Sequence, residues 1–463
     1  MSEIIVESVE GPVAPVRLVR AEAWEALAPT LSPAARAAAA LAKFTAKPGQ
    51  AAVVPAEDGT AAEVLFGLGA GAPAQTLRAI PARVPPGGAY AFADLPDGID
   101  ADDAALAWAM GTYRFDRYKQ KRGEPQPRLV APEGCDVARV RAAAHALALA
   151  RDMVNTPAND MGPLQIETIA REIAEAFGAK IEVVAGEALL EANYPAVHAV
   201  GRAAVEARAP RMIEISWGKA GAPLVAVVGK GVVFDTGGLD IKPSAGMRLM
   251  KKDMGGAAHA LALGRMIMAA GLPVRLVVLV PAVENAIAGD AMRPGDVLAS
   301  RKGLSIEVGN TDAEGRLILA DALARAAELE PAITIDMATL TGAARVALGP
   351  EVIPFYTADD ALAADIDAAS RRVGDPLWRM PLWDGYETSL DSDIADVKND
   401  PDGWAQAGSV TAALFLRRFA PTAGAWVHLD IFAWNPRNRP GWPAGAEAQA
   451  IRALFAMLSA RFA

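Results

Sequence analysis

The sequence predicts an α/β fold: a C-terminal domain with a mixed sheet flanked by helices, and a smaller N-terminal α/β domain. Three observations support this prediction. The 463 residues exceed the length of one ordinary domain. Short β-rich runs alternate with helical stretches after about residue 160. A polar, basic and proline-rich stretch at residues 120–133 is typical of a domain boundary.

The N-terminal part mixes short strands with alanine-rich helices. Residues 51–54 and 63–66 are β-rich and predict two strands. Ser32 followed by Pro33 predicts a helix over residues 34–44, because serine caps helix starts and proline suits the first turn.

A longer helix is expected over residues 137–154, which are rich in Ala and Leu. Pro157 ends it, because the residue before a proline disfavours the helical conformation. We therefore place the domains as follows: an N-terminal α/β domain at 1–135, a connecting helix at 136–160 and a C-terminal domain at 161–463.

The C-terminal part alternates strands and helices, which indicates a sheet with helices on both faces. The expected strands are 212–216, 224–228, 274–280, 333–336 and 426–431, and the expected helices include 255–270 and 315–329. In such sheets ligands bind at the carboxyl ends of the strands, so chemically active residues are expected there.

Composition excludes several functions. Lys plus Arg is 45 and Asp plus Glu is 55, and the net charge of −10 disfavours general nucleic-acid binding. The lone Cys135 excludes an intramolecular disulfide and a cysteine-rich zinc site. The N-terminus lacks a signal-peptide pattern, and no apolar run approaches the roughly 20 residues of a membrane span. We therefore expect a cytoplasmic protein with no membrane partner.

Three glycine-flanked segments carry carboxylates. They contain Asp235, Asp253, and the pair Asp312 and Glu314. Carboxylates that converge raise one another's pKa unless a cation neutralises them, and divalent metals with oxygen ligands are the usual solution. Two metals that share carboxylates are a common hydrolytic centre. The 4 histidines have no metal-ligand spacing, so the ligands of such a centre would be mainly carboxylates.

Each signal has an ordinary alternative. An isolated Asp-x-Glu is usually a solvated turn, and Glu314 could simply favour the positive end of the next helix. Lys230 lies between glycines, but the P-loop spacing is absent. The combination of segments is what points to a site.

The segments VGKGVVFDTGG (228–238), KKDMGGAA (251–258) and NTDAEGRL (310–317) resemble the signature segments of the cytosol (leucyl) aminopeptidases, a family of two-metal peptidases. The resemblance covers about residues 150–430. It implies that 161–463 is the catalytic peptidase domain of a homohexamer. It also implies release of the N-terminal residue, often leucine or another apolar one, from peptides with a free N-terminus.

The resemblance implies a set of metal ligands. One divalent ion, Mn²⁺ or Zn²⁺, would be held by Lys230, Asp235, Asp253 and Glu314, and the other by Asp235, Asp312 and Glu314. Lys230 must then be neutral, because an ammonium has no lone pair. The alternative is a Lys230 that forms an ion pair with Asp235.

The resemblance also implies catalytic and substrate-binding residues. Lys242 would stabilise the charge that develops on the carbonyl oxygen, and Arg316 would hold a bicarbonate that shuttles protons. The free α-amine would bind a metal and Asp253. Four residues would line the first side-chain pocket: Met250, Thr339, Leu340 and Gly342. For Met250 and Leu340, core packing is an equal alternative.

Two positions depart from the family pattern. Asp240 stands where a small polar residue is common, and its carboxylate could pair with Lys242 or raise the Lys242 pKa. The tail at 432–449 also differs, which affects the expected pocket shape. His428, on an apolar run, is interpreted as structural.

Other functions remain open. The same scaffold could serve a non-enzymatic role in binding DNA or protein, for which the small basic cluster of Lys121, Arg122 and Arg128 is weak support. A two-metal phosphatase is a further alternative, although such sites usually recruit histidines.

Overall fold

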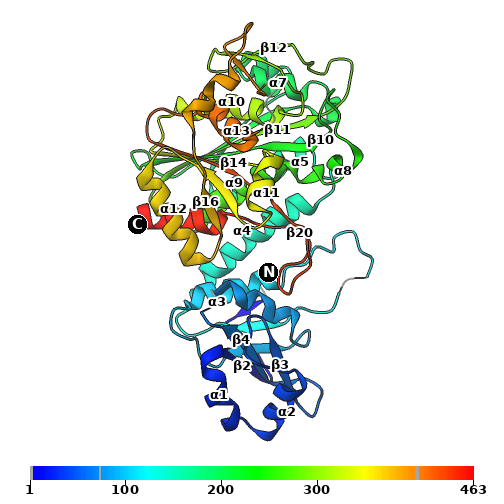
Figure 1. The fold of residues 1–463 in the computed structure, drawn as a ribbon, viewed down its shortest axis with the longest axis vertical. Coiled ribbons are helices and arrows are strands. Elements are labelled where there is room, and N and C mark those ends of the chain that lie inside the picture. The colour runs from blue at the N-terminus through cyan, green and yellow to red at the C-terminus, as the bar shows by residue number, and fades with distance from the viewer. Residues whose placement is uncertain (1–3, 72–73, 122, 402–405, 463) are drawn as a thin grey trace. The chain divides into compact units, whose positions relative to one another are not determined.

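The computed structural model describes residues 4–71, 74–121, 123–401 and 406–462, and Figure 1 shows the fold. The chain divides into two compact units. The first contains Met1–Ala148 and Asn435–Gly445, and the second contains Leu149–Trp434 and Ala446–Ala463. The predicted α/β class is confirmed, and each unit has a sheet of its own.

The first unit has a six-stranded sheet in the order β1-β6-β5-β2-β4-β3, parallel except for the edge pair β3 and β4. The elements up to the start of the second unit are β1 (Ile5–Val6), β2 (Val13–Arg20), α1 (Trp24–Leu27), α2 (Pro33–Leu41), β3 (Ala51–Pro55), β4 (Ala61–Gly69), β5 (Ala89–Phe92), α3 (Ala101–Gly111), β6 (Arg128–Val130) and α4 (Val137–Asn155).

Local sequence signals account for these elements. Ser32 accepts a hydrogen bond from the Ala35 N–H and caps α2, as its position before Pro33 predicts. The two expected strands are found as β3 and β4. Trp108 of α3 is fully buried in the core of the unit, where it packs near Tyr90 and Phe92.

The second unit holds a nine-stranded mixed sheet in the order β16-β15-β18-β14-β9-β11-β8-β7, with β10 beside β11. Its elements are α5 (Pro163–Phe177), β7 (Lys180–Ala185), α6 (Ala188–Glu191), α7 (Pro195–Gly201), β8 (Arg211–Trp217), β9 (Leu224–Gly229), β10 (Gly231–Asp235), α8 (Ser244–Met247), α9 (Gly255–Ala269), β11 (Arg275–Asn285), β12 (Val297–Ala299), β13 (Ser305–Glu307), α10 (Glu314–Ala327), β14 (Ile333–Ala338), α11 (Gly342–Leu348), β15 (Ile353–Tyr356), α12 (Asp360–Val373), β16 (Leu377–Arg379), β17 (Val397–Lys398), α13 (Gly408–Arg417), β18 (Ala425–Asp430) and α14 (Ile451–Phe462). Two further short strands lie at β19 (Trp434–Asn435) and β20 (Gly445–Ala446).

Helices cover both faces of this sheet (Figure 1). Along β11 successive side chains point to opposite faces. Val277 and Leu279 belong to the hydrophobic cluster that includes residues of α7 and α10. Leu276 and Val278 approach Gly264 of α9 on the other face. The central strands β9, β11 and β14 are buried and almost continuously apolar, as parallel strands covered on both faces must be.

The strand directions bring several chain segments to one edge of the sheet. β9, β10, β11 and β14 run parallel, so their carboxyl ends lie at the same edge. The residues at or just after these ends are Lys230, Asp235, Asn285 and Thr339. The sequence-based expectation that polar residues gather at this edge therefore has its structural basis here.

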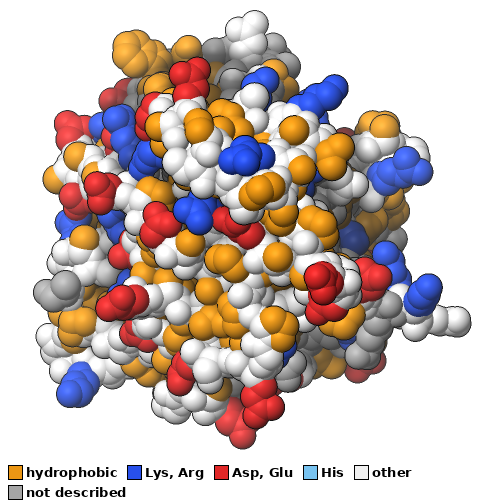
Figure 2. Space-filling view, turned by 90° about the horizontal axis from the view of Figure 1, so that it is seen from below, with side chains coloured by type: hydrophobic (Ala, Val, Ile, Leu, Met, Phe, Trp, Pro, Cys, Tyr) orange, Lys and Arg blue, Asp and Glu red, His pale blue; other side chains and the backbone are white. Residues whose placement is uncertain are grey.

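The described surface carries mixed charge. On the face shown in Figure 2, acidic and basic side chains are interspersed with apolar ones and do not separate into large patches of one sign. Of the small basic cluster named above, Arg122 lies outside the described residues. Within the described ranges, no helix is long and apolar enough to cross a membrane.

Candidate metal centre and peptidase site

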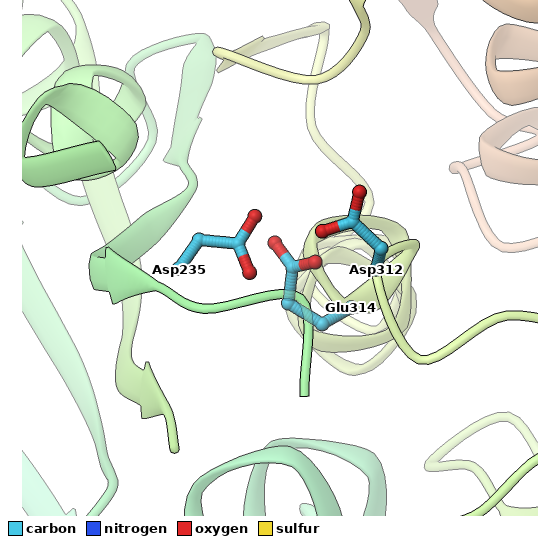
Figure 3. A group of neighbouring side chains, drawn as sticks. All are labelled: Asp235, Asp312 and Glu314. Atoms are coloured by element: carbon cyan, nitrogen blue, oxygen red, sulfur yellow. The ribbon is translucent and has the colours of Figure 1, made fainter. Parts of the chain in front are cut away.

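Three carboxylates converge at the sheet edge. Asp235 ends β10, Asp312 lies in the loop before α10, and Glu314 is the first residue of α10. One carboxylate oxygen from each lies within 4.8 Å of the other two. Figure 3 shows the three groups turned toward one another. Oxygen ligands in such a group suit a hard or borderline divalent cation.

Two lysines supply positive charge to the cluster. Lys230 Nζ lies 2.6 Å from Asp253 Oδ2 and 3.0 Å from Glu314 Oε1, and it donates a hydrogen bond to the Thr339 carbonyl. Lys230 therefore pairs directly with Asp253 and Glu314, and the pair with Asp235 that we considered is not among its close contacts.

Lys242 contacts the other side of the cluster. Its Nζ lies 2.8 Å from Asp235 Oδ2 and also pairs with Asp312 Oδ1. All five predicted metal ligands and Lys242 are thus brought together, and the two ammonium groups bridge carboxylates that come from three separate segments.

Glycines allow this close approach. A Cβ added at Gly315 would lie 2.4 Å from Lys230 Cε, and a Cβ at Gly256 would lie 2.1 Å from the Met337 carbonyl oxygen. Any side chain at either position would displace Lys230 or the backbone beside it. The glycines that flank the carboxylates in the sequence are therefore required by packing.

The cluster is electrostatically strained when no divalent cation is bound. Burial and the neighbouring Asp235 raise the Glu314 pKa to about 8. Burial and Asp235 also raise the Asp312 pKa to about 6. Burial acts in the same direction on Asp253, but Lys230 and Lys252 outweigh it and lower the Asp253 pKa.

The donor set fits a metal ion. Glu314 Oε2 is buried and has no hydrogen-bond partner, and no ion pair reaches it among the described residues. A buried carboxylate oxygen without a partner is costly, and a cation between Glu314, Asp235 and Asp312 would satisfy it.

A second set of side chains holds the carboxylates in place, and the sequence did not reveal it. Asn285, the last residue of β11, donates hydrogen bonds to Asp235 Oδ1 at 2.9 Å and to the Thr311 carbonyl at 3.2 Å. Thr311 Oγ1 in turn donates to the Gly237 carbonyl. Asn285 could have been suspected only from its place at a strand end.

Asp240 belongs to this holding set and is not a partner of Lys242. Its Oδ2 accepts a hydrogen bond from the Thr311 N–H at 2.8 Å, and its own N–H donates to Thr311 Oγ1 at 2.8 Å. No ion pair joins it to Lys242 among the described contacts. The expectation that Asp240 could pair with Lys242 is therefore wrong. Asp240 instead links the loop after β10 to the loop before α10.

We expect Asp240→Ala to lower kcat/KM about tenfold. The substitution removes the link that fixes the distance between Asp235 and the Asp312 loop, and a loss of about 1.4 kcal/mol of transition-state stabilisation corresponds to that factor. Steady-state kinetics of the aminopeptidase activity that the family resemblance implies, with an N-terminal leucine substrate, measures it. Asp94→Ala, an exposed change in the first unit, is the control. Full activity in Asp240→Ala would show that the loop before α10 keeps its position without the contact between Asp240 and Thr311.

Asn399 organises the loop that carries Asp312 and Glu314. Its Oδ1 accepts hydrogen bonds from the Gly309 and Asn310 N–H groups, and its Nδ2 donates to the carbonyls of Asn310 and Ala313. The Asn399 side chain is fully buried. It lies within a segment that resembles the family pattern, but the sequence assigned it no role.

Arg316 lies just outside the carboxylate cluster. Its Nη1 donates to the Asn399 carbonyl at 2.6 Å, and its guanidinium lies 6.0 Å from the centre of the Phe415 ring. Its Nε is buried without a hydrogen-bond partner among the described residues. Burial lowers the pKa of Arg316. A buried guanidinium with an unused N–H can donate a hydrogen bond to a bound anion.

One predicted pocket residue, Thr339, contacts Asp253 directly. The Thr339 hydroxyl donates to Asp253 Oδ1 at 2.9 Å. Asp430, which the sequence did not single out, accepts hydrogen bonds from the Leu340 and Thr341 N–H groups and from the Thr341 hydroxyl, so it fixes the segment that follows β14.

The remaining pocket residues differ in exposure. Gly342 is exposed at the start of α11, and Met250 is half-buried in the 3-10 helix Met250–Met254. Leu340 is half-buried and packs in part against the hydrophobic core, so the core-packing alternative holds in part for this residue.

His428 has a structural environment. It is fully buried on β18, and its Nδ1 lies 2.5 Å from Asp336 Oδ1 on the neighbouring strand. Asp336 also accepts from the Trp426 indole N–H. The geometry agrees with the interpretation of His428 as structural.

Comparisons with known proteins identify the family of this chain. The catalytic domain of the cytosol aminopeptidase family matches residues 148–455, and the M17 aminopeptidase N-terminal domain matches residues 14–132. A probable cytosol aminopeptidase of Syntrophotalea carbinolica is 41% identical over 392 residues, 80% of this chain and 77% of that protein. Another, of Rhizobium rhizogenes, is 39% identical over 425 residues, 85% of this chain and 84% of that protein.

Solved structures give the same result. The crystal structure of a cytosol aminopeptidase from Coxiella burnetii has a TM-score of 0.92 and 40% identity, with 99% of both chains covered. A bottromycin maturation enzyme in complex with Mn has a TM-score of 0.87 and 34% identity, and covers 97% of this chain and 99% of that one.

The fold, the acidic cluster and these matches define a hydrolase that acts on peptides. More specifically, the chain belongs to the cytosol aminopeptidase family. The family resemblance read from the three glycine-flanked segments is thereby confirmed.

Proposed function

We propose that this protein is a two-metal aminopeptidase that releases leucine-like N-terminal residues from peptides. The observation that carries the proposal is the convergence of Asp235, Asp312 and Glu314, with Glu314 Oε2 buried and unpartnered. The neighbouring enzyme structure that is described as a Mn complex supports a metal in such a site.

The five ligand candidates divide between two ions. Lys230, Asp235, Asp253 and Glu314 would hold one divalent cation, Mn²⁺ or Zn²⁺, and Asp235, Asp312 and Glu314 would hold the other. When bound, two such ions acidify a water for attack on the peptide carbonyl and polarise that carbonyl. Lys230 can serve as a ligand only as a neutral amine, for which bound metal would have to displace its proton.

The chain's own groups orient the substrate and balance charge. Asp253 is buried beside Thr339, where its carboxylate can accept a hydrogen bond from the free α-amine of a peptide. An acetylated N-terminus has lost the positive charge that Asp253 attracts, so such a peptide should be a poor substrate. Lys242 is partly accessible at the edge of the cluster and can donate to the oxygen that becomes negative during attack.

Arg316 is proposed to hold a small anion such as bicarbonate, because its buried Nε–H has no partner among the described residues. An anion held there would supply general acid–base chemistry for the amide hydrolysis. The catalytic domain is proposed to span 161–463, and a cytoplasmic homohexamer is proposed from family membership.

Hydrolysis of leucine p-nitroanilide tests the proposal. The purified protein should release p-nitroaniline, lose this activity in chelator and regain it with Mn²⁺ or Zn²⁺. N-acetyl-leucine p-nitroanilide should not be cleaved, because its amine is blocked. Cleavage that survives exhaustive chelation would contradict metal dependence, and equal cleavage of the acetylated substrate would contradict the aminopeptidase assignment.

A further inference from the structure

Arg345 lies in the first turn of α11, beside two residues of the segment expected to line the side-chain pocket. Its Nη1 donates to the Thr341 carbonyl at 3.2 Å. Its Nη2 lies 3.7 Å from the place that a Cβ on Gly342 would occupy. Gly342 is one of the residues expected to line the pocket, so the guanidinium stands directly beside it.

Phe432 holds this guanidinium in place. The Arg345 guanidinium carbon lies 4.5 Å from the centre of the Phe432 ring, a stacking distance. Phe432 is buried, with 8% of its surface exposed. The aromatic ring therefore forms a fixed platform, and little side-chain entropy would be lost when Arg345 contacts a ligand.

The stacked pair lies on the side of the pocket that contains Asp253. A Cβ at Gly255, two residues after Asp253, would lie 2.7 Å from Ala433 Cβ and 2.9 Å from Thr339 Cγ2. Ala433 directly follows Phe432. The segment that carries the aromatic platform therefore runs beside Thr339, next to the carboxylate proposed to bind the α-amine.

The positive charge of Arg345 is not neutralised by a close carboxylate. Among the described residues no Asp or Glu oxygen forms an ion pair with it. Asp430 and Asp253 act on it only at longer range. The Asp430 oxygens already accept hydrogen bonds from Leu340 and Thr341.

A second cation lies near the same platform. Lys252 Nζ is buried and lies 5.6 Å from the centre of the Phe432 ring. Lys252 Nζ also forms an ion pair with Asp253 Oδ1 at 3.5 Å, and the Arg345 charge helps to lower the pKa of Lys252. Asp253 therefore partly balances Lys252, whereas Arg345 has no ion pair with a carboxylate among the described residues.

We propose that Arg345, seated on Phe432, is a specificity-determining residue that favours acidic and disfavours basic N-terminal side chains. This rests on the proposed aminopeptidase function and narrows its substrate class. The free guanidinium N–H groups can donate to a substrate carboxylate. A lysine or arginine side chain in the same place meets an unneutralised like charge in a partly desolvated site. Apolar side chains meet neither effect.

The test is the ratio of kcat/KM for aspartyl and lysyl aminomethylcoumarin substrates, with the leucyl substrate as reference for turnover. Wild-type protein should prefer the aspartyl substrate to the lysyl one. Arg345→Glu should shift the aspartyl-to-lysyl ratio toward lysine by about 100-fold, because two unit charges change. Arg345→Lys should keep the wild-type order of preference. Arg371→Glu, the same charge change on the exposed face of α12, should leave the ratio unchanged.

An aspartyl-to-lysyl ratio that moves less than about threefold in Arg345→Glu would overturn the proposal. Calorimetric titration of the metal-loaded protein with free L-aspartate and L-lysine measures the same preference without turnover. Absence of leucyl hydrolysis would count against the proposed function alone, since the titration still reports the charge preference. Equal affinities for the two amino acids in wild type and Arg345→Glu would refute the role of Arg345 even if hydrolysis is normal.

Discussion

Replacing Glu314 with Gln is expected to lower kcat at least ~10³-fold while leaving the protein folded. Glu314, the first residue of α10, belongs to both proposed ligand sets, as Asp235 does. One of its carboxylate oxygens lies within 4.8 Å of an oxygen of Asp235 and an oxygen of Asp312. A glutamine keeps the shape but cannot supply a negative charge shared between two cations. Metal content should fall with activity.

In the metal-free protein, the free energy of unfolding of the same variant should fall less with rising pH than that of wild type, although its activity is lower. In the metal-free protein, burial and Asp235 raise the Glu314 pKa to about 8, whereas a glutamate in an unfolded chain titrates near about 4.3. The folded state therefore binds this proton more tightly. The stabilising contribution of the protonated Glu314 carboxyl is complete below about pH 4 and is lost as the pH rises toward about 8. Glutamine removes this dependence.

Thermal unfolding in chelator between pH 5 and pH 8 measures the effect (roughly the window between the two pKa values). The wild-type protein should lose more stability over this range than Glu314→Gln does. Glu175→Gln, an exposed change on α5, controls for the loss of a surface charge. A Glu314→Gln protein that retains more than a tenth of the activity would exclude Glu314 as a shared ligand.

The sequence predicted much of the framework that positions these residues. The strand expected over 224–228 is β9, and the helix expected over 315–329 is α10, which begins one residue earlier at Glu314. These elements could be predicted because their signals are local: buried parallel strands are continuously apolar, and a carboxylate favours a helix start. The glycine-flanked carboxylates marked the strand ends in the same local way.

The side chains that hold the cluster could not be predicted, because their contacts join distant parts of the chain. Asn285 meets Asp235 across 50 positions, and Asp430 meets Leu340 across 90. An asparagine at a strand end has many ordinary explanations until the fold brings it to a carboxylate. Asp240 shows the same limit: proximity in sequence favoured Lys242 as its partner, but the turn directs its carboxylate to Thr311.

A contact between residues far apart in the sequence also determines the proposed charge preference of the pocket. The tail at 432–449 departs from the family pattern, but its composition alone did not show which of its residues approach the site. The structure brings Phe432 beneath Arg345, although 87 positions separate them in the sequence. Charge preference in the pocket thus depends on a contact that no local pattern encodes.

Replacing Asn399 with Ala is expected to reduce both stability and activity. The buried amide bonds to two N–H and two carbonyl groups of the loop at 309–313, and of these the Asn310 carbonyl also accepts from the Ala313 N–H. Removing the amide therefore takes a partner from all four groups and leaves the Asn310 carbonyl with its second one. Unpaired buried groups cost about 1–3 kcal/mol each, and partial relaxation gives an expected loss of about 3 kcal/mol in the free energy of unfolding. Because the loop carries Asp312 and leads into Glu314, kcat/KM should fall about 100-fold.

Urea unfolding and leucyl-substrate kinetics measure the two effects separately. Asn399→Asp is the informative companion, because aspartate can still accept from Gly309 and Asn310 but cannot donate to the carbonyls of Asn310 and Ala313. It should also be impaired, since it adds a buried charge facing two carbonyl oxygens. Asn159→Ala, an exposed asparagine, is the control. If Asn399→Ala unfolds like wild type yet loses activity, the amide positions the ligands without supporting the fold. If it loses stability alone, the loop keeps its geometry by other contacts, and the ligand-positioning role of Asn399 is excluded.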